Sequence, residues 1–94
     1  MKINKSIGLS REIIISALND LDYTINEIEG NIIYASAKAS LLSWGEDISI
    51  ELSEIEKSTT RIKINSASKA QLISWGKNDE NIKLITNKIK EFAS

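Results

Sequence analysis

The residues of this chain that are best suited to binding chemistry lie in a stretch that the sequence contains twice. Residues 35–47 read ASAKASLLSWGED, and residues 66–78 read SASKAQLISWGKN, at an offset of 31 positions. The repeat aligns two lysines and two tryptophans, Lys38 with Lys69 and Trp44 with Trp75. An indole face attracts cations and flat groups, and an ammonium group attracts anions. The spacing therefore indicates a shared role for the two copies.

Three interpretations of the repeat are open. In each copy a glycine follows the tryptophan, and glycine readily adopts positive φ, so we expect sharp turns at Gly45 and Gly76. The interpretation that we favour has both indoles closing one end of a small hydrophobic core, because tryptophan buries a large apolar area. A second has the indoles and lysines lining a shallow groove for an anionic or flat ligand. A third places the indoles in a contact between copies of the chain.

Five pairs of neighbouring carboxylates are the other candidates for chemistry. They are Asp20 and Asp22, Glu27 and Glu29, Glu46 and Asp47, Glu54 and Glu56, and Asp79 and Glu80. General acid–base catalysis needs two carboxylates to converge in a partly desolvated pocket. Nothing in the spacing brings these pairs together, and all but the last fall at predicted strand ends or turns, where acidic side chains are solvated. We therefore expect no catalytic site.

Composition excludes several further kinds of site. The 94 residues include no cysteine and no histidine, which removes disulfides, thiol nucleophiles, imidazole bases and the usual zinc ligands. Twelve Lys and Arg against 13 Asp and Glu give a formal charge of -1 and no basic footprint for nucleic acid or anionic lipid. We expect no cofactor, no nucleic-acid partner and no enzymatic activity.

Chain length and the first residues indicate one small domain, residues 1–94. A chain of this size hides only about 60–65% of its unfolded surface, so its core is small. The N-terminal sequence MKINKSIGLS carries no apolar run, and therefore resembles neither a signal peptide nor a membrane anchor. The expected location is the cytoplasm.

The hydrophobic pattern of the first half predicts a strand, a helix and a hairpin. Alternation over 2–7 is a weak edge-strand signal, and Ser10 is a suitable N-cap for a helix over about 11–21. Strands over 23–28 and 32–37 flank Glu29-Gly30-Asn31. A three-residue loop there pairs Ile28 with Ile32 and keeps Tyr23, Ile25, Ile33, Ala35 and Ala37 on one face. A two-residue loop at Gly30-Asn31 turns Ile25 away from Ile33, so we favour the longer loop.

The second half predicts two more strands and a closing helix. Ile48, Ile50 and Leu52 alternate with polar residues over 47–54, and the pattern resumes over 60–66, with Glu51 able to face Lys63 or Arg61. Asn78 and Asp79 are expected to cap the final helix, whose apolar stripe is Ile82, Ile85, Ile89 and Phe92.

Together these elements predict an α+β fold in the order β-α-β-β-β-β-α, with an antiparallel meander and both helices on one face of the sheet. The other face is expected to show Ile28, Ile32 and Tyr34.

A family resemblance rests on residues 66–82, SASKAQLISWGKNDENI. They resemble the C-terminal signature of a family of small bacterial proteins of unknown function, S-x-S-[RK], four variable residues, then [DS]-x-G-x-N-x-x-x-I. The matching residues are Ser66, Ser68, Lys69, Gly76, Asn78 and Ile82. The chain departs at Ser74, where Asp is commoner, and at Trp75, where an aliphatic residue is usual. The resemblance implies a bacterial origin and carries no activity.

The element order is also similar to a trimmed Bet v 1 or START-type helix-grip domain, whose longer members hold hydrophobic ligands. Our leading hypothesis is a non-enzymatic interaction or small-ligand-binding module, with a homo-oligomer or another protein as partner. Its candidate residues are Trp44, Trp75, Lys38, Lys69 and Tyr34. The alternative is a hydrophobic-ligand carrier, with an apolar cavity lined by Ile85, Ile89 and the inward strand residues.

Overall fold

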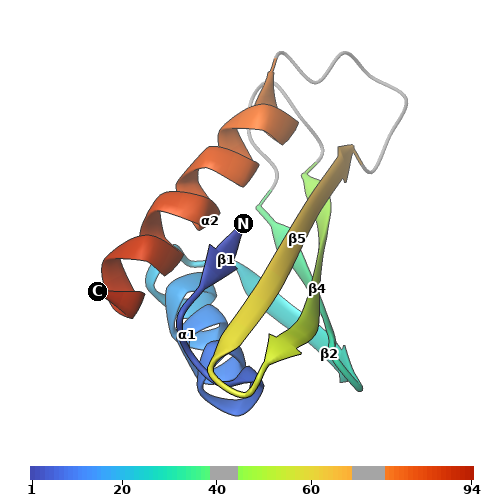
Figure 1. Ribbon diagram of the computed structural model, residues 1–94. Coiled ribbons are helices and arrows are strands. Elements are labelled where there is room, and N and C mark those ends of the chain that lie inside the picture. The colour runs from blue at the N-terminus through green and yellow to red at the C-terminus, as the bar shows by residue number, and fades with distance from the viewer. Residues whose placement is uncertain (39–44, 69–75) are drawn as a thin grey trace.

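The computed structural model describes residues 1–38, 45–68 and 76–94, and in these residues the chain has the predicted α+β fold (Figure 1). Five strands form one antiparallel sheet in the order β1-β5-β4-β3-β2, and two helices lie on one of its faces. The elements are β1 (Lys2–Ile3), α1 (Ile7–Asp20), β2 (Thr24–Glu29), β3 (Ile32–Ala37), β4 (Glu46–Glu56), β5 (Thr59–Ser68) and α2 (Lys77–Ala93).

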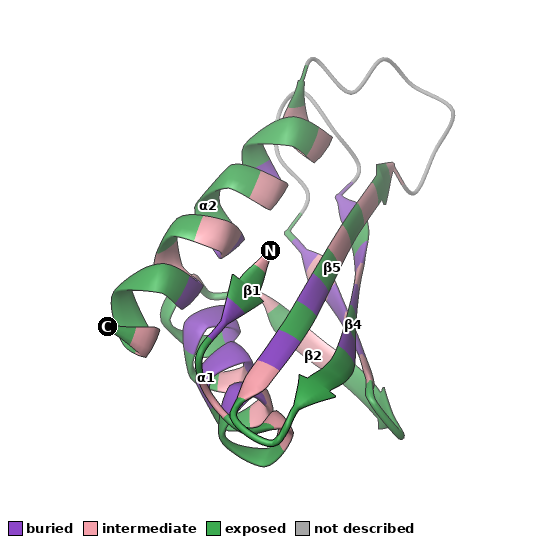
Figure 2. Ribbon diagram, viewed as in Figure 1, coloured by how far each residue is buried: buried purple, intermediate pink, exposed green. Residues whose placement is uncertain are grey.

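The hydrophobic core lies between the helices and the sheet, and isoleucine dominates it. Along β4 and β5 buried residues alternate with exposed ones, because successive side chains of a strand point to opposite faces (Figure 2). The fully buried large apolar side chains are Ile14, Leu18, Ile33, Ile48, Ile50, Ile62, Ile85 and Ile89. Burial of one such side chain contributes roughly 1.5–3 kcal/mol.

Helix α1 begins earlier than predicted. Its N-cap is Ser6, whose hydroxyl accepts a hydrogen bond from the Leu9 N–H at 3.3 Å. Ser10, the predicted cap, is instead buried within the helix and donates to the Lys5 carbonyl at 3.4 Å. The strand expected over 2–7 shrinks accordingly to β1, because Ile7 is the first residue of the helix.

The β2–β3 loop is shorter than predicted. Glu29 lies opposite Ile32, so the loop contains only Gly30 and Asn31, and Gly30 has a φ of 60°. A bulge between Ile25 and Glu27 then shifts the register. Residue 25 thereby returns to the face that it shares with Ala35, which is the result that the longer loop was expected to give.

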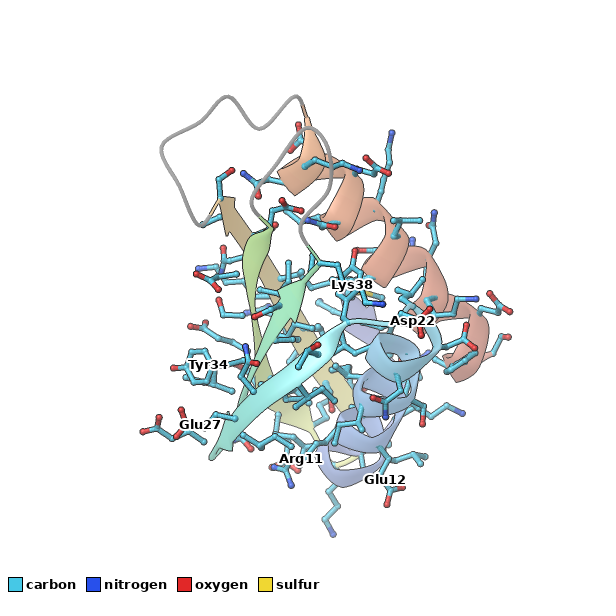
Figure 3. The ribbon with its side chains drawn as sticks, turned by 180° about the vertical axis from the view of Figure 1, so that it is seen from behind. Arg11, Glu12, Asp22, Glu27, Tyr34 and Lys38 are labelled. Atoms are coloured by element: carbon cyan, nitrogen blue, oxygen red, sulfur yellow. The ribbon has the colours of Figure 1, made fainter. Side chains whose placement is uncertain are left out.

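One residue of the predicted outer face lies on the other side. Ile28 pairs with Ile33 and therefore points to the helix-covered face, although 45% of its surface stays exposed at the sheet edge. Ile32 and Tyr34 are on the outer face as predicted. Figure 3 shows the side chains of Tyr34 and Glu27 projecting from the side of the sheet opposite the helices.

The β4–β5 hairpin follows the predicted facing. Ile48, Ile50 and Leu52 are buried, and Glu51 lies opposite Lys63. Both strands extend beyond their predicted ends, and Glu56 pairs with Thr59 across a two-residue turn.

Helix α2 begins without the predicted side-chain cap. Gly76 occupies the N-cap position with a φ of 80°, and no side chain caps the helix. The buried stripe is Asn81, Ile85 and Ile89. Phe92, predicted to belong to it, is 37% exposed, with the Lys88 ammonium 5.7 Å from its ring centre. In the described parts of the chain, neither helix is long and apolar enough to span a bilayer.

Candidate functional site

Among the residues that the structure describes, only part of the sheet edge formed by β5 is covered. β1 pairs with it at Arg61 and Thr60, and the main chain of Met1 continues the pairing at Ile62. The N-terminal ammonium of Met1 donates to the Ile62 carbonyl at 2.9 Å, and the Ile62 N–H donates to the Met1 carbonyl at 2.7 Å. Met1 is therefore the last described residue that pairs with this edge.

Beyond Ile62 the edge presents backbone hydrogen-bonding groups. Main-chain groups of a strand alternate between its two neighbours. The N–H and C=O groups of Ile64 and Ser66 consequently point to the same edge as those of Ile62. Among the described strands, β1 and β4 are the neighbours of β5, and the pairing of β1 ends before Ile64. An unpaired strand edge is a template for another strand.

A cavity of about 470 Å³ follows this edge between β5 and α2. We call it the edge groove; its lining residues are Met1, Lys2, Arg61, Ile62, Lys63, Ile64, Ile82 and Thr86. Half-buried Ile64 and Ile82 give it apolar walls on the helix-covered side. On the outer face the exposed side chains of Lys2, Arg61 and Lys63 give it a basic rim.

The opposite edge of the sheet has the opposite charge. On β2, Glu27 and Glu29 are exposed and lie on the outer face, since they pair with Tyr34 and Ile32. Between them Ile28 points to the other face and is half exposed. The outer face is thus basic along one edge and acidic along the other.

A hydrogen-bonded polar network joins α2 to the end of the sheet. Asn81, 5% exposed, donates to the Glu46 carboxylate at 2.7 Å and accepts from the Tyr23 hydroxyl at 2.6 Å. Glu46 is 2% exposed. The sequence had indicated a solvated carboxylate at this strand end, which is wrong because α2 covers it.

The same network includes three of the residues on which the family resemblance rests. The Ser66 hydroxyl donates to Asn78 Oδ1 at 2.8 Å, and Asn78 Nδ2 donates to Ser68 Oγ at 3.4 Å. Asn81 Nδ2 also lies 3.3 Å from Ser66 Oγ. The Asn78 side chain therefore binds the end of β5 instead of capping its own helix. We call these six residues the end network; they are Tyr23, Glu46, Ser66, Ser68, Asn78 and Asn81.

The end network is electrostatically negative at Tyr23. Burial, as the largest cause, and the negative charges of Glu46 and Glu80 together raise the pKa of the Tyr23 phenol to about 12. The proton on this hydroxyl is the one donated to Asn81, so the network needs the neutral phenol.

Beside the network is a cavity of about 270 Å³. Its lining includes Tyr23, Lys38, Glu46, Lys77 and Asn81. Of the predicted site residues, Lys38 lies here and Tyr34 lies on the outer face (Figure 3). The other three, Trp44, Lys69 and Trp75, lie outside the described residues. The three interpretations of the repeat depend on the two indoles and therefore stay predictions. The positive φ predicted at the glycines after the two tryptophans is confirmed, since Gly45 and Gly76 have φ values of 99° and 80°.

Sequence reasoning missed the edge groove. Arg61 and Lys63 alternate with Ile62 and Ile64. This alternation predicts which face of the strand is buried, but it does not indicate that the edge of the strand is open. The sequence signal that would have found the groove is Ser6 as the helix N-cap, because a helix that begins at Ile7 leaves only a short strand before it to pair with the ten-residue β5.

No protein-family model matches the chain, and a comparison with curated proteins finds no match either. The resemblance of residues 66–82 to the bacterial signature therefore stays a prediction. Within the described ranges, no group of three or more acidic, histidine or cysteine side chains is placed to hold a metal ion.

Proposed function

We propose that this protein is a non-enzymatic interaction module whose edge groove binds an extended, acidic segment of a protein as an added strand. The observation that carries the proposal is the β5 edge, where outward main-chain groups at Ile64 and Ser66 adjoin a cavity of about 470 Å³. In strand addition, main-chain hydrogen bonds supply affinity, and pockets for alternate side chains supply specificity.

Main-chain pairing accounts for the extended conformation of the ligand. A strand laid beside β5 exchanges hydrogen bonds with the N–H and C=O of Ile64 and Ser66. Each such bond contributes about 0.5–1.5 kcal/mol net. Met1 already uses the groups of Ile62, so the added strand continues where the N-terminal pairing ends.

Side chains account for the composition of the ligand. Alternate residues of the added strand point toward Ile64 and Ile82, which favours apolar side chains there. The intervening residues point to the outer face beside Arg61 and Lys63, which favours glutamate or aspartate. The proposed ligand therefore alternates apolar and acidic residues.

The position of the cavity favours this function over a hydrophobic-ligand carrier. A carrier needs its cavity beneath the C-terminal helix, where Ile85 and Ile89 are fully buried in the core. The edge groove instead opens beside the helix at Ile82 and Thr86. The proposal includes the expected cytoplasmic location and the expected absence of catalysis.

The test is a titration of ¹⁵N-labelled protein with a capped heptapeptide of alternating glutamate and isoleucine. We expect saturable shifts at the amides of β5 and slowed exchange of the Ile64 and Ser66 amides. A heptapeptide with lysine in place of glutamate is the matched control and should bind more weakly, because it faces a basic rim. Added salt should reduce this difference.

The variant Ile64→Pro removes an N–H that points away from the sheet, so the fold keeps its internal hydrogen bonds. Peptide binding should be lost in this variant and kept in Ile28→Pro, which alters the other edge. The proposal fails if the glutamate peptide leaves the β5 amides unchanged at saturating concentration, or if Ile64→Pro binds as well as the wild type.

A further inference from the structure

We infer that the acidic strand that fits the edge groove is β2 of a second copy of this chain, so that molecules associate edge to edge, β2 against β5. The pairing assumes that the groove accepts a strand, and so it rests on the proposed function. It adds the identity of the partner and the register of the contact.

Charge complementarity is the first observation that supports the pairing. Lys2, Arg61 and Lys63 lie at one edge of the outer face, and Glu27 and Glu29 lie at the other. The order β5-β4-β3-β2 separates β5 from β2 by three strand spacings, or about 14 Å. Screening at physiological salt acts over about 8 Å, so the two sets neutralise each other poorly within one molecule. Lys63 also lies opposite Glu51 of β4, whereas the residue opposite Arg61 is the uncharged Ser53. Edge-to-edge contact between two molecules brings the basic and acidic side chains onto neighbouring strands, about 5 Å apart.

Register is the second observation. Across the helix-covered face, one row of the sheet consists of Ile28, Ile33, Ile50 and Ile64, each opposite the next. The neighbouring row on the outer face consists of Glu29, Ile32, Glu51 and Lys63. Placing Ile28 of one copy opposite Ile64 of another continues the isoleucine row without a shift. The same antiparallel alignment places Glu29 opposite Lys63.

Main-chain geometry agrees with this register. Glu29 and Ile32 flank a two-residue loop, so their main-chain groups face each other across the hairpin. The groups of Ile28 consequently point away from β3, to the free edge of the sheet. The groups of Ile64 point to the free edge of β5. Opposed in an antiparallel pair, the two isoleucines exchange two hydrogen bonds.

The pairing would also bury the exposed side chain of Ile28. This side chain is 45% exposed in the single molecule, and the alignment directs it over Ile64 and Ile82 in the edge groove. The bulge between Ile25 and Glu27 confines regular pairing to the last residues of β2. A contact this short is expected to be weak and reversible.

The two surfaces differ, so the contact is heterologous. Each added copy leaves one β2 edge and one β5 edge free, which produces open chains or rings and not a closed two-fold dimer. The average mass of the wild type should therefore rise continuously with protein concentration and fall with added salt.

Sedimentation velocity with two proline variants tests the contact. Ile28→Pro blocks the β2 edge and Ile64→Pro blocks the β5 edge, and each replaces an N–H that points away from the sheet. Each variant alone should stay monomeric at concentrations where the wild type associates. An equimolar mixture should form a 1:1 dimer and nothing larger, because one intact β2 meets one intact β5. Formation of that dimer also shows that both variants fold.

Charge reversal tests the register independently. Glu29→Lys and Lys63→Glu should each weaken association by about two- to tenfold, since an exposed attraction becomes a repulsion, and the double variant should regain most of it. The inference is overturned if the wild type stays monomeric, if the mixture forms no dimer, or if both proline variants associate like the wild type. In that case binding of the glutamate heptapeptide at β5 still supports the proposed function. If neither the peptide nor a second copy binds, both the proposed function and this inference fail.

Discussion

A buried glutamate determines how α2 meets the sheet. A charged carboxylate inside a protein is strongly destabilising unless hydrogen bonds compensate its desolvation. Glu46 receives a hydrogen bond from Asn81, which is itself held by Tyr23. These three side chains come from the start of β4, the first turns of α2 and the residue before β2. The network therefore ties the first turns of α2 to the start of β4 and to the residue before β2.

The raised pKa of Tyr23 makes part of the stability dependent on pH at the alkaline end. A tyrosine in the unfolded chain titrates near pH 10, and Tyr23 in the folded protein titrates near 12. The folded state thus holds the proton more tightly. The contribution of Tyr23 to stability is complete below pH 10 and is lost as the pH rises from 10 to 12.

Phenolate absorbance measures this effect directly. The difference between the titrations of wild type and Tyr23→Phe isolates Tyr23 from Tyr34, and its midpoint should lie near 12. Urea unfolding at pH 8 and pH 11 should show a smaller alkaline loss of stability in Tyr23→Phe than in the wild type. A midpoint near 10 would contradict burial of this hydroxyl in the network.

At the scale of elements, two glycines give opposite expectations for the same substitution. Gly8 lies inside α1, and a Cβ added there meets no atom within 4 Å. Gly76 precedes α2 and is equally open, but its φ is 80°. Gly8→Ala should stabilise the protein by about 0.5–1 kcal/mol, since alanine favours helix. Gly76→Ala should destabilise it by about 1–2 kcal/mol, since only its backbone conformation opposes a side chain.

Thermal unfolding of the two alanine variants compares them under one condition. Equal shifts of the melting temperature in the same direction would show that Gly76 is not held in the left-handed conformation.

The order of elements was predictable because it depends on local patterns. The alternation of Ile48, Ile50 and Leu52 defines both a strand and its buried face within five residues. The β2–β3 register was not predictable in this way, since the bulge after Ile25 compensates for the short loop. A loop that is one residue shorter moves each side chain of β2 to the other face, and a one-residue bulge moves the side chains beyond it back again. The apolar pattern at Ile25 therefore fits both a three-residue loop without a bulge and a two-residue loop with one.

The candidate site was less predictable than the fold, for a related reason. Burial of Glu46 depends on α2, whose contacting residue Asn81 is 35 positions away. The edge groove depends on where β1 stops, and its residues come from both ends of the chain. Of the predicted site residues, Lys38 and Tyr34 are described, and they lie in different places.

At the scale of the molecule, a single small core supports both helices and the sheet. Ile85 is fully buried in it, whereas Phe92, seven residues later on α2, is 37% exposed. Ile85→Ala should therefore destabilise the protein by about 2–5 kcal/mol, with one cooperative transition. Phe92→Ala should cost well under half as much.

Circular dichroism in urea gives both values, and the slope of the transition should be the same for the two variants. If Phe92→Ala lost more stability than Ile85→Ala, Phe92 would belong to the buried stripe of α2, as predicted from the sequence, and the core would lie against another face of the helix.

The bonds between Met1 and Ile62 have a practical consequence for work with this protein. Residues fused ahead of Met1 would continue from this pairing toward Ser66, the place that we propose for an added strand. An affinity tag at the front of the chain would then compete with the proposed ligand. A tag fused after Ser94, beyond the end of α2, leaves that place open.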